Sequence, residues 1–130
     1  MFFEKNRGGS LKETVLWTNP SPTISFGYTL VTLSDDFTNY KFIKITYYKD
    51  TNGGTLYSSG LYTPDAIKTF YGTPAGRGAL AYTETSSLAY VRNIIYSGTD
   101  TELQFGNGLK VNAAGTAPSM LIPYQIIGLK

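Results

Sequence analysis

The chain has 130 residues, a length suited to one domain, and its 11 basic and 9 acidic residues give a net charge of +2. It has no cysteine and no histidine, which excludes disulfides, thiolate metal sites and histidine-based acid–base or metal chemistry. Nucleic-acid-binding proteins usually carry a clustered basic stripe, and the balanced charge therefore predicts no nucleic-acid partner. Tyrosine is abundant, with 11 residues beside 14 glycines, and this composition favours strands joined by tight turns.

The first twelve residues contain two adjacent phenylalanines, Phe2 and Phe3, then several charges, then Gly8-Gly9-Ser10. A Gly-Gly-Ser run is typical of a flexible joint. The apolar stretch is too short and too charged for a signal peptide, and no later segment has the length of a membrane span, so we predict no membrane insertion. Exposed adjacent apolar groups promote association. We therefore interpret residues 1–12 as an arm for oligomerisation or attachment through Phe2 and Phe3. The alternative is that both rings add to the core.

The domain itself is predicted over residues 13–130, with its first strand at Glu13–Thr18. Alternation of side chains places Val15 and Trp17 on one face of that strand. Trp17 is the only tryptophan, and we predict that it anchors the core because its ring buries a large area. The Asn-Pro-Ser-Pro run that follows ends the strand, since proline donates no ladder hydrogen bond.

A second strand is predicted at Thr23–Leu33. Its apolar alternation changes phase near Leu30, which suggests a bulge or burial on both faces. The polar stretch Ser34–Asn39 then predicts a turn, with one helical turn capped by Ser34 or Asp35 as an alternative.

The clearest strand pattern is Tyr40–Asp50, which contains no glycine and no proline. We predict a half-buried central strand, because alternate residues fall on one side at a period of two: Ile43, Ile45 and Tyr47. The Asn-Gly pair within Thr51–Gly54 predicts a hairpin, and Thr55–Tyr62 is predicted to return as the partner strand.

The rest of the chain alternates between apolar segments and turn signals. A short apolar piece at Ala66–Phe70 precedes the loosest loop, Tyr71–Gly78, and Gly106 and Gly108 predict a further turn. Pro123 places the last strand at a sheet edge or marks a bulge. Further strands are predicted at Ala79–Thr85, Leu88–Tyr96, Thr101–Phe105, Leu109–Asn112 and Met120–Leu129. About eight to ten strands with frequent turns predict an all-β fold, an antiparallel and jelly-roll-like β-sandwich.

Acidic residues show no arrangement that signals catalysis. Asp35 and Asp36 are adjacent, so on a strand they would point to opposite faces. A glycosidase needs two carboxyl groups across a cleft, commonly about 5–10 Å apart. Candidate pairs such as Glu84 with Asp65 or with Glu102 exist, but nothing in the sequence brings such a pair together. We therefore predict no catalytic residue, and a small glycoside-active enzyme remains a third hypothesis.

The Asp-Thr-Asn-Gly-Gly run at residues 50–54 faintly resembles a calcium-binding loop. The full pattern needs more oxygen ligands and a distal glutamate, which are absent here, and a hairpin turn explains the run better. Arg77 and the glycines around it likewise lack the strand–loop–helix context of a phosphate-binding loop. We predict no metal site and no cofactor.

Surface recognition is the role that these residues favour. Aromatic faces stack on sugars, and the tyrosine hydroxyl adds a hydrogen bond. In the loosest loop, three glycines around Arg77 allow close approach of the backbone and leave that side chain free to reach a ligand. The tyrosines available for a recognition surface are Tyr47, Tyr48, Tyr57, Tyr62, Tyr71, Tyr82, Tyr90 and Tyr96. The residues predicted to bind a ligand are Tyr48, Tyr62, Tyr71 and Arg77.

Three segments resemble parts of small modules in the structural proteins of tailed phages and prophages. They are Glu13–Thr23 (ETVLWTNPSPT), Asn39–Tyr48 (NYKFIKITYY) and Ile122–Lys130 (IPYQIIGLK). Their order and spacing match, so the resemblance extends from about Glu13 to Lys130. It implies a β-sandwich module of tail-fibre, baseplate or head-fibre type; such modules often oligomerise and in several cases bind host surface glycans. None of the segments is a catalytic motif, and the resemblance fixes no binding residue.

The leading hypothesis is therefore a non-enzymatic virion structural protein, made in the cytoplasm of the bacterial host before assembly. It would lie at the particle surface and take part in assembly or in attachment to the host. Its expected partners are further copies of itself, other virion proteins and a host surface glycan. The alternative is a carbohydrate-binding module, which the excess of tyrosine favours.

Overall fold

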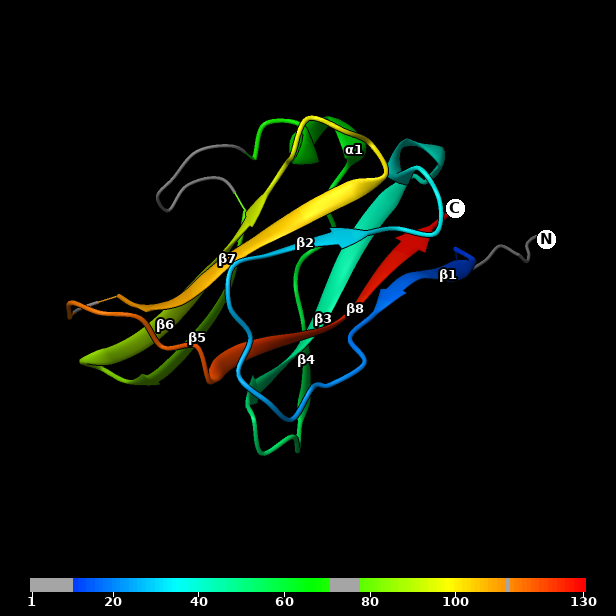
Figure 1. The fold of residues 1–130 in the computed structure, drawn as a ribbon. Coiled ribbons are helices and arrows are strands. Elements are labelled where there is room, and N and C mark those ends of the chain that lie inside the picture. Colours follow the sequence, from blue (N-terminus) through cyan, green and yellow to red (C-terminus); the bar gives the residue numbers. More distant parts are fainter. Residues whose placement is uncertain (1–10, 71–77, 112) are drawn as a thin grey trace.

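The protein is a sandwich of two antiparallel β-sheets (Figure 1). A computed structural model describes residues 11–70, 78–111 and 113–130. The strand orders are β1-β8-β3-β4 in one sheet and β2-β7-β6-β5 in the other. The strands are β1 (Glu13–Thr18), β2 (Thr29–Thr32), β3 (Phe42–Asp50), β4 (Leu56–Ser58), β5 (Ala79–Thr85), β6 (Leu88–Ile95), β7 (Glu102–Lys110) and β8 (Met120–Leu129). The predicted all-β sandwich is confirmed. Helix in these residues is limited to the 3-10 turn η1 (Phe37–Asn39) and the one-turn α1 (Pro64–Ile67).

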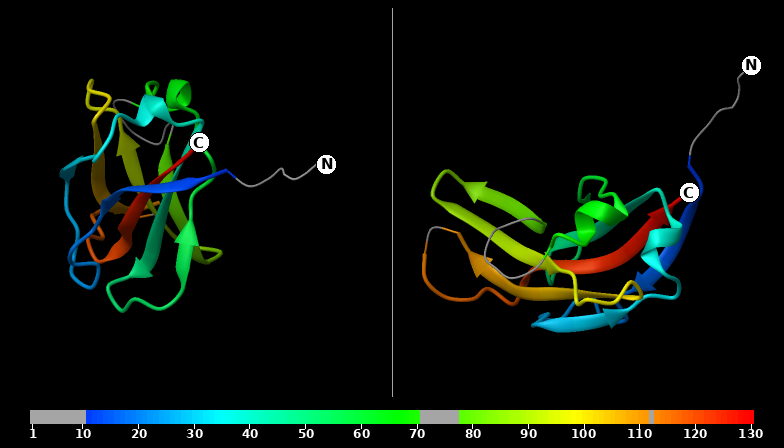
Figure 2. Two further views of the ribbon diagram at one scale, coloured as in Figure 1. Left: turned by 90° about the vertical axis from the view of Figure 1, so that its right-hand side faces the viewer. Right: turned by 90° about the horizontal axis from the view of Figure 1, so that it is seen from above.

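The chain crosses between the sheets at both of its ends. β1 and β2 lie in different sheets, and each borders a strand from the end of the chain, β8 and β7 respectively. These two outer pairs wrap around the sandwich as in a jelly roll. The inner connections are simpler, because β3–β4 is a direct hairpin and β5, β6 and β7 form a meander. Figure 2 shows the β5–β6 hairpin projecting at one end of the molecule.

β3 is a central strand, as its alternating pattern predicts. Ile43, Ile45 and Tyr47 face the other sheet, with exposed fractions of 0%, 1% and 7%. The returning strand is shorter than predicted, because β4 is confined to Leu56–Ser58. Tyr62, at the end of the predicted strand, forms only an isolated bridge with Ile43.

β8 pairs with β1 on one side and β3 on the other, so the prediction of an edge position was wrong. The alternative of a bulge is confirmed. Thr46 pairs with Gln125 and Tyr47 pairs with Pro123. Tyr124 is therefore an extra residue in β8. Proline is tolerated in a central strand here because a bulge interrupts the ladder. The Asn19 backbone and side-chain N–H groups donate to the carbonyls of Tyr124 and Pro123 at 2.7 and 2.8 Å.

A bulge also changes the expected faces of β1. The pairing with β8 shifts between Val15 and Trp17, so Leu16 is the extra residue. Val15 is 47% exposed, whereas Leu16 is 2% exposed. The prediction that Val15 and Trp17 share a face was therefore wrong. Trp17 does pack against the core, as predicted, with its ring 6.3 Å from Phe26 and 5.9 Å from Phe105.

The predicted strand Thr23–Leu33 is reduced to the four residues of β2, which form the edge of their sheet. Val31 is buried against the core, but Ile24, Tyr28 and Leu30 are exposed by 60%, 61% and 49%. The pairing of β2 with β7 has no register shift and Leu30 is exposed, so the predicted bulge or burial on both faces was wrong. The change of phase separates an exposed apolar side from a buried one.

Gly106 and Gly108 lie inside β7, so the turn predicted between two strands was wrong. The pairing of β6 with β7 shifts between Arg92 and Ile94, so β7 is bulged at this point. A Cβ atom at Gly108 would collide with the carbonyl oxygen of Ala117 and lie 3.1 Å from Nη2 of Arg92. Glycine is needed here for close approach, not for a turn.

Arg92 is the largest of the fully buried side chains, and it points inward from β6. Burial lowers the pKa of Arg92 to about 10, so the guanidinium keeps its charge at neutral pH. No carboxylate among residues 11–70, 78–111 and 113–130 forms an ion pair with it. Its N–H groups donate instead to backbone carbonyls: Nε to Leu121 (2.8 Å), Nη1 to Phe26 and Gly106 (both 2.8 Å), and Nη2 to Met120 (2.8 Å) and Pro118 (3.4 Å).

We expect Arg92→Met to lower the free energy of unfolding by roughly 3 kcal/mol or more, because each buried carbonyl left without a donor costs about 1–3 kcal/mol. Urea unfolding followed by Trp17 fluorescence measures the change. Lys41→Met is the matched control, because it removes a cation from an exposed position on the surface. Equal midpoints for both variants would contradict the structural role of Arg92.

Candidate functional site

Four of the residues predicted for binding or assembly lie outside the described residues: Phe2, Phe3, Tyr71 and Arg77. Their roles stay predictions. The other two, Tyr48 and Tyr62, are described, and β3 separates them. Tyr48 is on the outward face of that strand, whereas Tyr62 bridges to the inward-facing Ile43. They therefore do not form one site.

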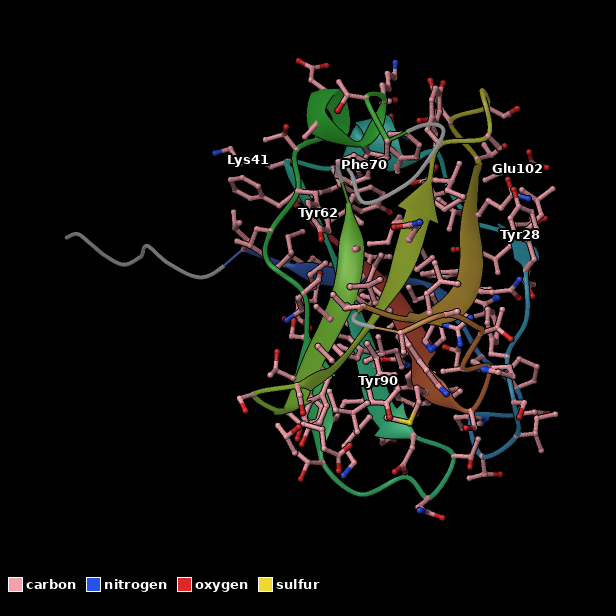
Figure 3. All side chains as sticks on the ribbon, turned by 90° about the vertical axis from the view of Figure 1, so that its left-hand side faces the viewer. Tyr28, Lys41, Tyr62, Phe70, Tyr90 and Glu102 are labelled. Atoms are coloured by element: carbon pink, nitrogen blue, oxygen red, sulfur yellow. The ribbon has the colours of Figure 1, made fainter. Side chains whose placement is uncertain are left out.

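Tyr62 is engaged by packing. The Tyr62 backbone N–H donates to the Ile43 carbonyl at 2.9 Å, and the Tyr62 carbonyl accepts from the Ile43 N–H at 2.8 Å. Its ring meets Phe70 edge-on at 5.1 Å (Figure 3). Burial raises the pKa of Tyr62, which reflects how far its hydroxyl is removed from water. Tyr62 thus covers the core at the side of β3.

Tyr48 belongs to an apolar surface on the outside of the sheet β1-β8-β3-β4. Its ring lies 5.3 Å from that of Tyr124, the bulged residue of β8. By register, the outward side chains of this sheet include eight apolar or aromatic ones, which we call the outer apolar face: Val15, Phe42, Tyr48, Leu56, Ile122, Tyr124, Ile127 and Leu129.

The outer apolar face lies apart from the core between the sheets. Ile122, Ile127 and Leu129 are at most 8% exposed, yet none of them belongs to the central cluster of buried residues. Val15 and Leu56 are still 47% and 44% exposed. A sheet with one face in water normally alternates apolar inward and polar outward residues. The exposed Val15 and Leu56 and the half-buried Phe42, Tyr48 and Tyr124 are the members that a partner could reach, and exposed apolar groups gathered on one face are typical of a contact surface.

A second group of aromatic residues lies where the edges of the two sheets meet. Tyr47 stacks on Tyr57 at 5.9 Å, and Tyr57 meets Tyr82 edge-on at 5.6 Å. The Tyr47 hydroxyl donates to the Ala81 carbonyl at 3.0 Å, which links β3 to β5 across the sandwich. We call Tyr47, Tyr57 and Tyr82 the tyrosine cluster.

Charged groups border the tyrosine cluster. Lys49 Nζ lies 5.4 Å from the centre of the Tyr82 ring and 3.8 Å from a carboxylate oxygen of Glu84. The first contact is within the range of a cation–π interaction. The side chains of Lys49 and Glu84 are 33% and 38% exposed, so both remain accessible to water.

An open hollow of about 260 Å³ adjoins the cluster at the β3–β4 hairpin. Asp50 Oδ1 accepts from the Asn52 backbone N–H at 2.9 Å, which fixes the turn. Gly53 and Gly54 adopt positive φ angles of 77° and 87°. The lining residues are Lys49, Asp50, Asn52, Gly53, Thr55 and Tyr57. The run that resembles a calcium loop therefore forms a hairpin turn with polar side chains beside an aromatic ring.

Asp35 and Asp36 serve local structure. Asp36 caps η1 by accepting from the Thr38 N–H at 2.8 Å, so the predicted cap at Ser34 or Asp35 was wrong. Asp35 accepts from the Tyr40 hydroxyl at 3.0 Å, and this bond lowers the pKa of the Asp35 carboxyl. No group of three or more acidic side chains within the described ranges is placed to hold a metal ion.

From the sequence, Tyr57 and Tyr82 were only two of eight tyrosines available for a recognition surface, neither was among the predicted ligand-binding residues, and Lys49 was not considered. The two tyrosines belong to edge strands of different sheets, and only the strand order brings them together. Their local sequences carry no signal for this contact beyond the general excess of tyrosine.

Comparison with protein-family models, with curated proteins and with solved structures gave no match. The resemblance to phage modules therefore rests on the three sequence segments alone. Among the described residues, no helix is both long and apolar enough to cross a membrane.

We predict a loss of stability at alkaline pH from the buried Tyr47 and the half-buried Tyr62. Burial raises the pKa of Tyr47 and of Tyr62 above the ordinary value of 10.0. The folded state then favours the neutral phenol, so its contribution is complete below about pH 10 and is lost as the pH rises through the folded-state pKa. Arg92 has the opposite effect on the pH dependence of stability. Its folded-state pKa of about 10 lies below the ordinary 12.5, so loss of its proton favours the folded state as the pH rises.

We compare Tyr47→Phe with the parent chain, since Arg92 contributes equally to both. At neutral pH the free energy of unfolding of the variant should be about 1 kcal/mol lower, because the hydrogen bond to the Ala81 carbonyl is missing. Its free energy of unfolding should then fall less steeply above pH 10. Urea titrations at several pH values measure both effects, with the exposed Tyr28→Phe as the control. Parallel pH curves for Tyr47→Phe and the parent would refute the assignment.

Proposed function

We propose that the chain is a non-enzymatic structural protein of a phage virion, exposed at the particle surface and engaged in assembly or host attachment. The observation that carries the proposal is the outer apolar face, which provides a contact surface on one side of the sandwich. The three phage-like sequence segments add to this support, and all three overlap strands of the same sheet, β1, β3 and β8.

The proposed occupant of the outer apolar face is the N-terminal arm of a neighbouring copy. The arm is continuous with β1, whose first residue pairs with Leu129 on this face. Ten residues in extended form span roughly 33 Å, whereas the face extends roughly 20 Å along β3 from Phe42 to Tyr48. Phe2 and Phe3 would supply the apolar contact, and Gly8-Gly9-Ser10 would permit the change of direction.

A polar pair within the face would orient such a contact. Lys44 Nζ lies 2.9 Å from Glu13 Oε2, and the two side chains are 24% and 53% exposed. An exposed ion pair of this kind adds little stability. The pair does interrupt the apolar surface at one defined place. A partner that carries matching polar groups at that place would therefore bind in preference to one that does not.

A carbohydrate-binding module, free or carried by such a particle, is the second candidate. The observation that favours it is the tyrosine cluster beside the polar hollow of the β3–β4 hairpin. Aromatic rings with adjacent hydrogen-bonding groups match the alternating apolar and polar surfaces of sugars.

Assembly through the arm is tested by the mass of the protein in solution. We expect the full chain to form a homo-oligomer by light scattering, and a chain that lacks residues 1–10 to be monomeric. Val15→Asp, on the outer apolar face, should also give monomers, because it buries a charge in the contact.

Val111→Asp is the matched control, since Val111 is 51% exposed and lies outside the face. It should leave the oligomer unchanged. A monomeric full chain, or an oligomer that survives both the deletion and Val15→Asp, would refute assembly through this surface.

A further inference from the structure

We infer that the tyrosine cluster and the adjoining hollow form a binding site for a neutral oligosaccharide. The inference rests on the second candidate function, a carbohydrate-binding module, and it names the site and the ligand class. The site combines the three rings of the cluster with Lys49, Glu84 and the residues of the hairpin turn.

The strand order opens the site to one side. β4 and β5 are edge strands, one in each sheet, so no further strand covers Tyr57 or Tyr82 from outside. Both rings are half-buried, which leaves part of each accessible while the rest is held by packing. Tyr47 lies beneath them at 7% exposure and is fixed by its bond to the Ala81 carbonyl. The accessible rings are thus held in place before any ligand binds, which lowers the entropic cost of binding.

The aromatic surface continues along the inner side of the second sheet. Tyr82 pairs directly with Tyr90 of β6, and Tyr90 pairs with Lys110 of β7. Directly paired residues of neighbouring strands have Cβ atoms about 4.5–5.5 Å apart. Tyr57, Tyr82 and Tyr90 therefore follow one another across the strands, from β4 over β5 to β6. Such a row fits a chain of sugar units better than one compact ligand.

The charges near the rings favour a neutral ligand. Lys49 is balanced by Glu84 at 3.8 Å, and Asp50 adds a carboxylate to the lining of the hollow. A nucleic-acid strand would need cations along the rings without these carboxylates. Sugar hydroxyls, in contrast, donate to carboxylates and accept from ammonium and amide groups, all of which are present at Lys49, Asp50 and Asn52.

The size of the hollow is compatible with the end of such a chain. Pockets that enclose drug-sized ligands have volumes of about 300–1,000 Å³. At about 260 Å³ and open to solvent, the hollow suits a single sugar unit whose chain continues over Tyr82. The Tyr57 ring lines the hollow and would stack on that first unit.

Titration of the full chain with neutral hexasaccharides tests the site. The probes are maltohexaose, cellohexaose and hexa-N-acetylchitohexaose, and binding is followed by calorimetry and by backbone amide chemical shifts. We expect one of the probes to bind and to shift the amides of the β3–β4 hairpin and of β5. Tyr57→Ala and Tyr82→Ala should each weaken that binding at least tenfold.

Two further variants separate recognition from folding. Tyr28→Ala removes a tyrosine that is 61% exposed on the far edge of the sandwich, and it should bind as the parent does (Figure 3). Asn52→Ala changes an exposed side chain of the turn without touching the core, and it should also weaken binding. Unfolding midpoints are measured for every variant.

If a probe binds and Tyr57→Ala, Tyr82→Ala and Asn52→Ala all bind it as the parent does, this site is refuted while carbohydrate binding stands. If none of the probes binds the full chain, the inferred ligand class is refuted together with the second candidate function. Neither result bears on assembly through the outer apolar face, which is tested separately by the mass of the protein in solution.

Discussion

The structure depends on one buried cation. Arg92 donates five hydrogen bonds to carbonyls of β7, of β8 and of the segments that precede β2 and β8. A charged group in the interior is costly unless its donors are satisfied. The guanidinium has five N–H donors in a fixed plane, and here they meet carbonyls from four places in the chain. The bulge in β7 and the missing Cβ at Gly108 make room for this arrangement. Arg92 thus holds the two sheets in one relative position.

Bulges determine which surfaces the protein presents. The extra residue Tyr124 in β8 lies beside Tyr48, and the extra residue Leu16 in β1 turns Val15 outward. Without them, a period of two would repeat along both strands. The apolar sequence of β8 follows from its place between β1 and β3, with the core on one side and the outer apolar face on the other. The bulge that lets the sheet accept Pro123 also places the ring of Tyr124 beside Tyr48 on the outer apolar face.

Local patterns in the sequence predict what depends on near neighbours. The alternation in β3, the hairpin at Gly53 and the sandwich class all follow from periodicity and turn residues. Such patterns do not predict contacts between strands that are distant in the sequence. Gly106 and Gly108 read as a turn until Ala117 and Arg92 are known to lie against them. The meeting of Tyr57 with Tyr82 likewise requires the strand order, which many sandwich sequences leave open.

The two proposed surfaces share β3 but use opposite sides of it. Tyr47 points into the sandwich and supports the tyrosine cluster, whereas Tyr48 points outward and packs on Tyr124. Adjacent residues of a strand face opposite ways, so a contact on one side does not occlude the other. A particle protein that used the outer apolar face for assembly would keep the tyrosine cluster free at the edge formed by β4 and β5. Assembly and recognition can therefore coexist in one small domain, separated by the thickness of a single sheet.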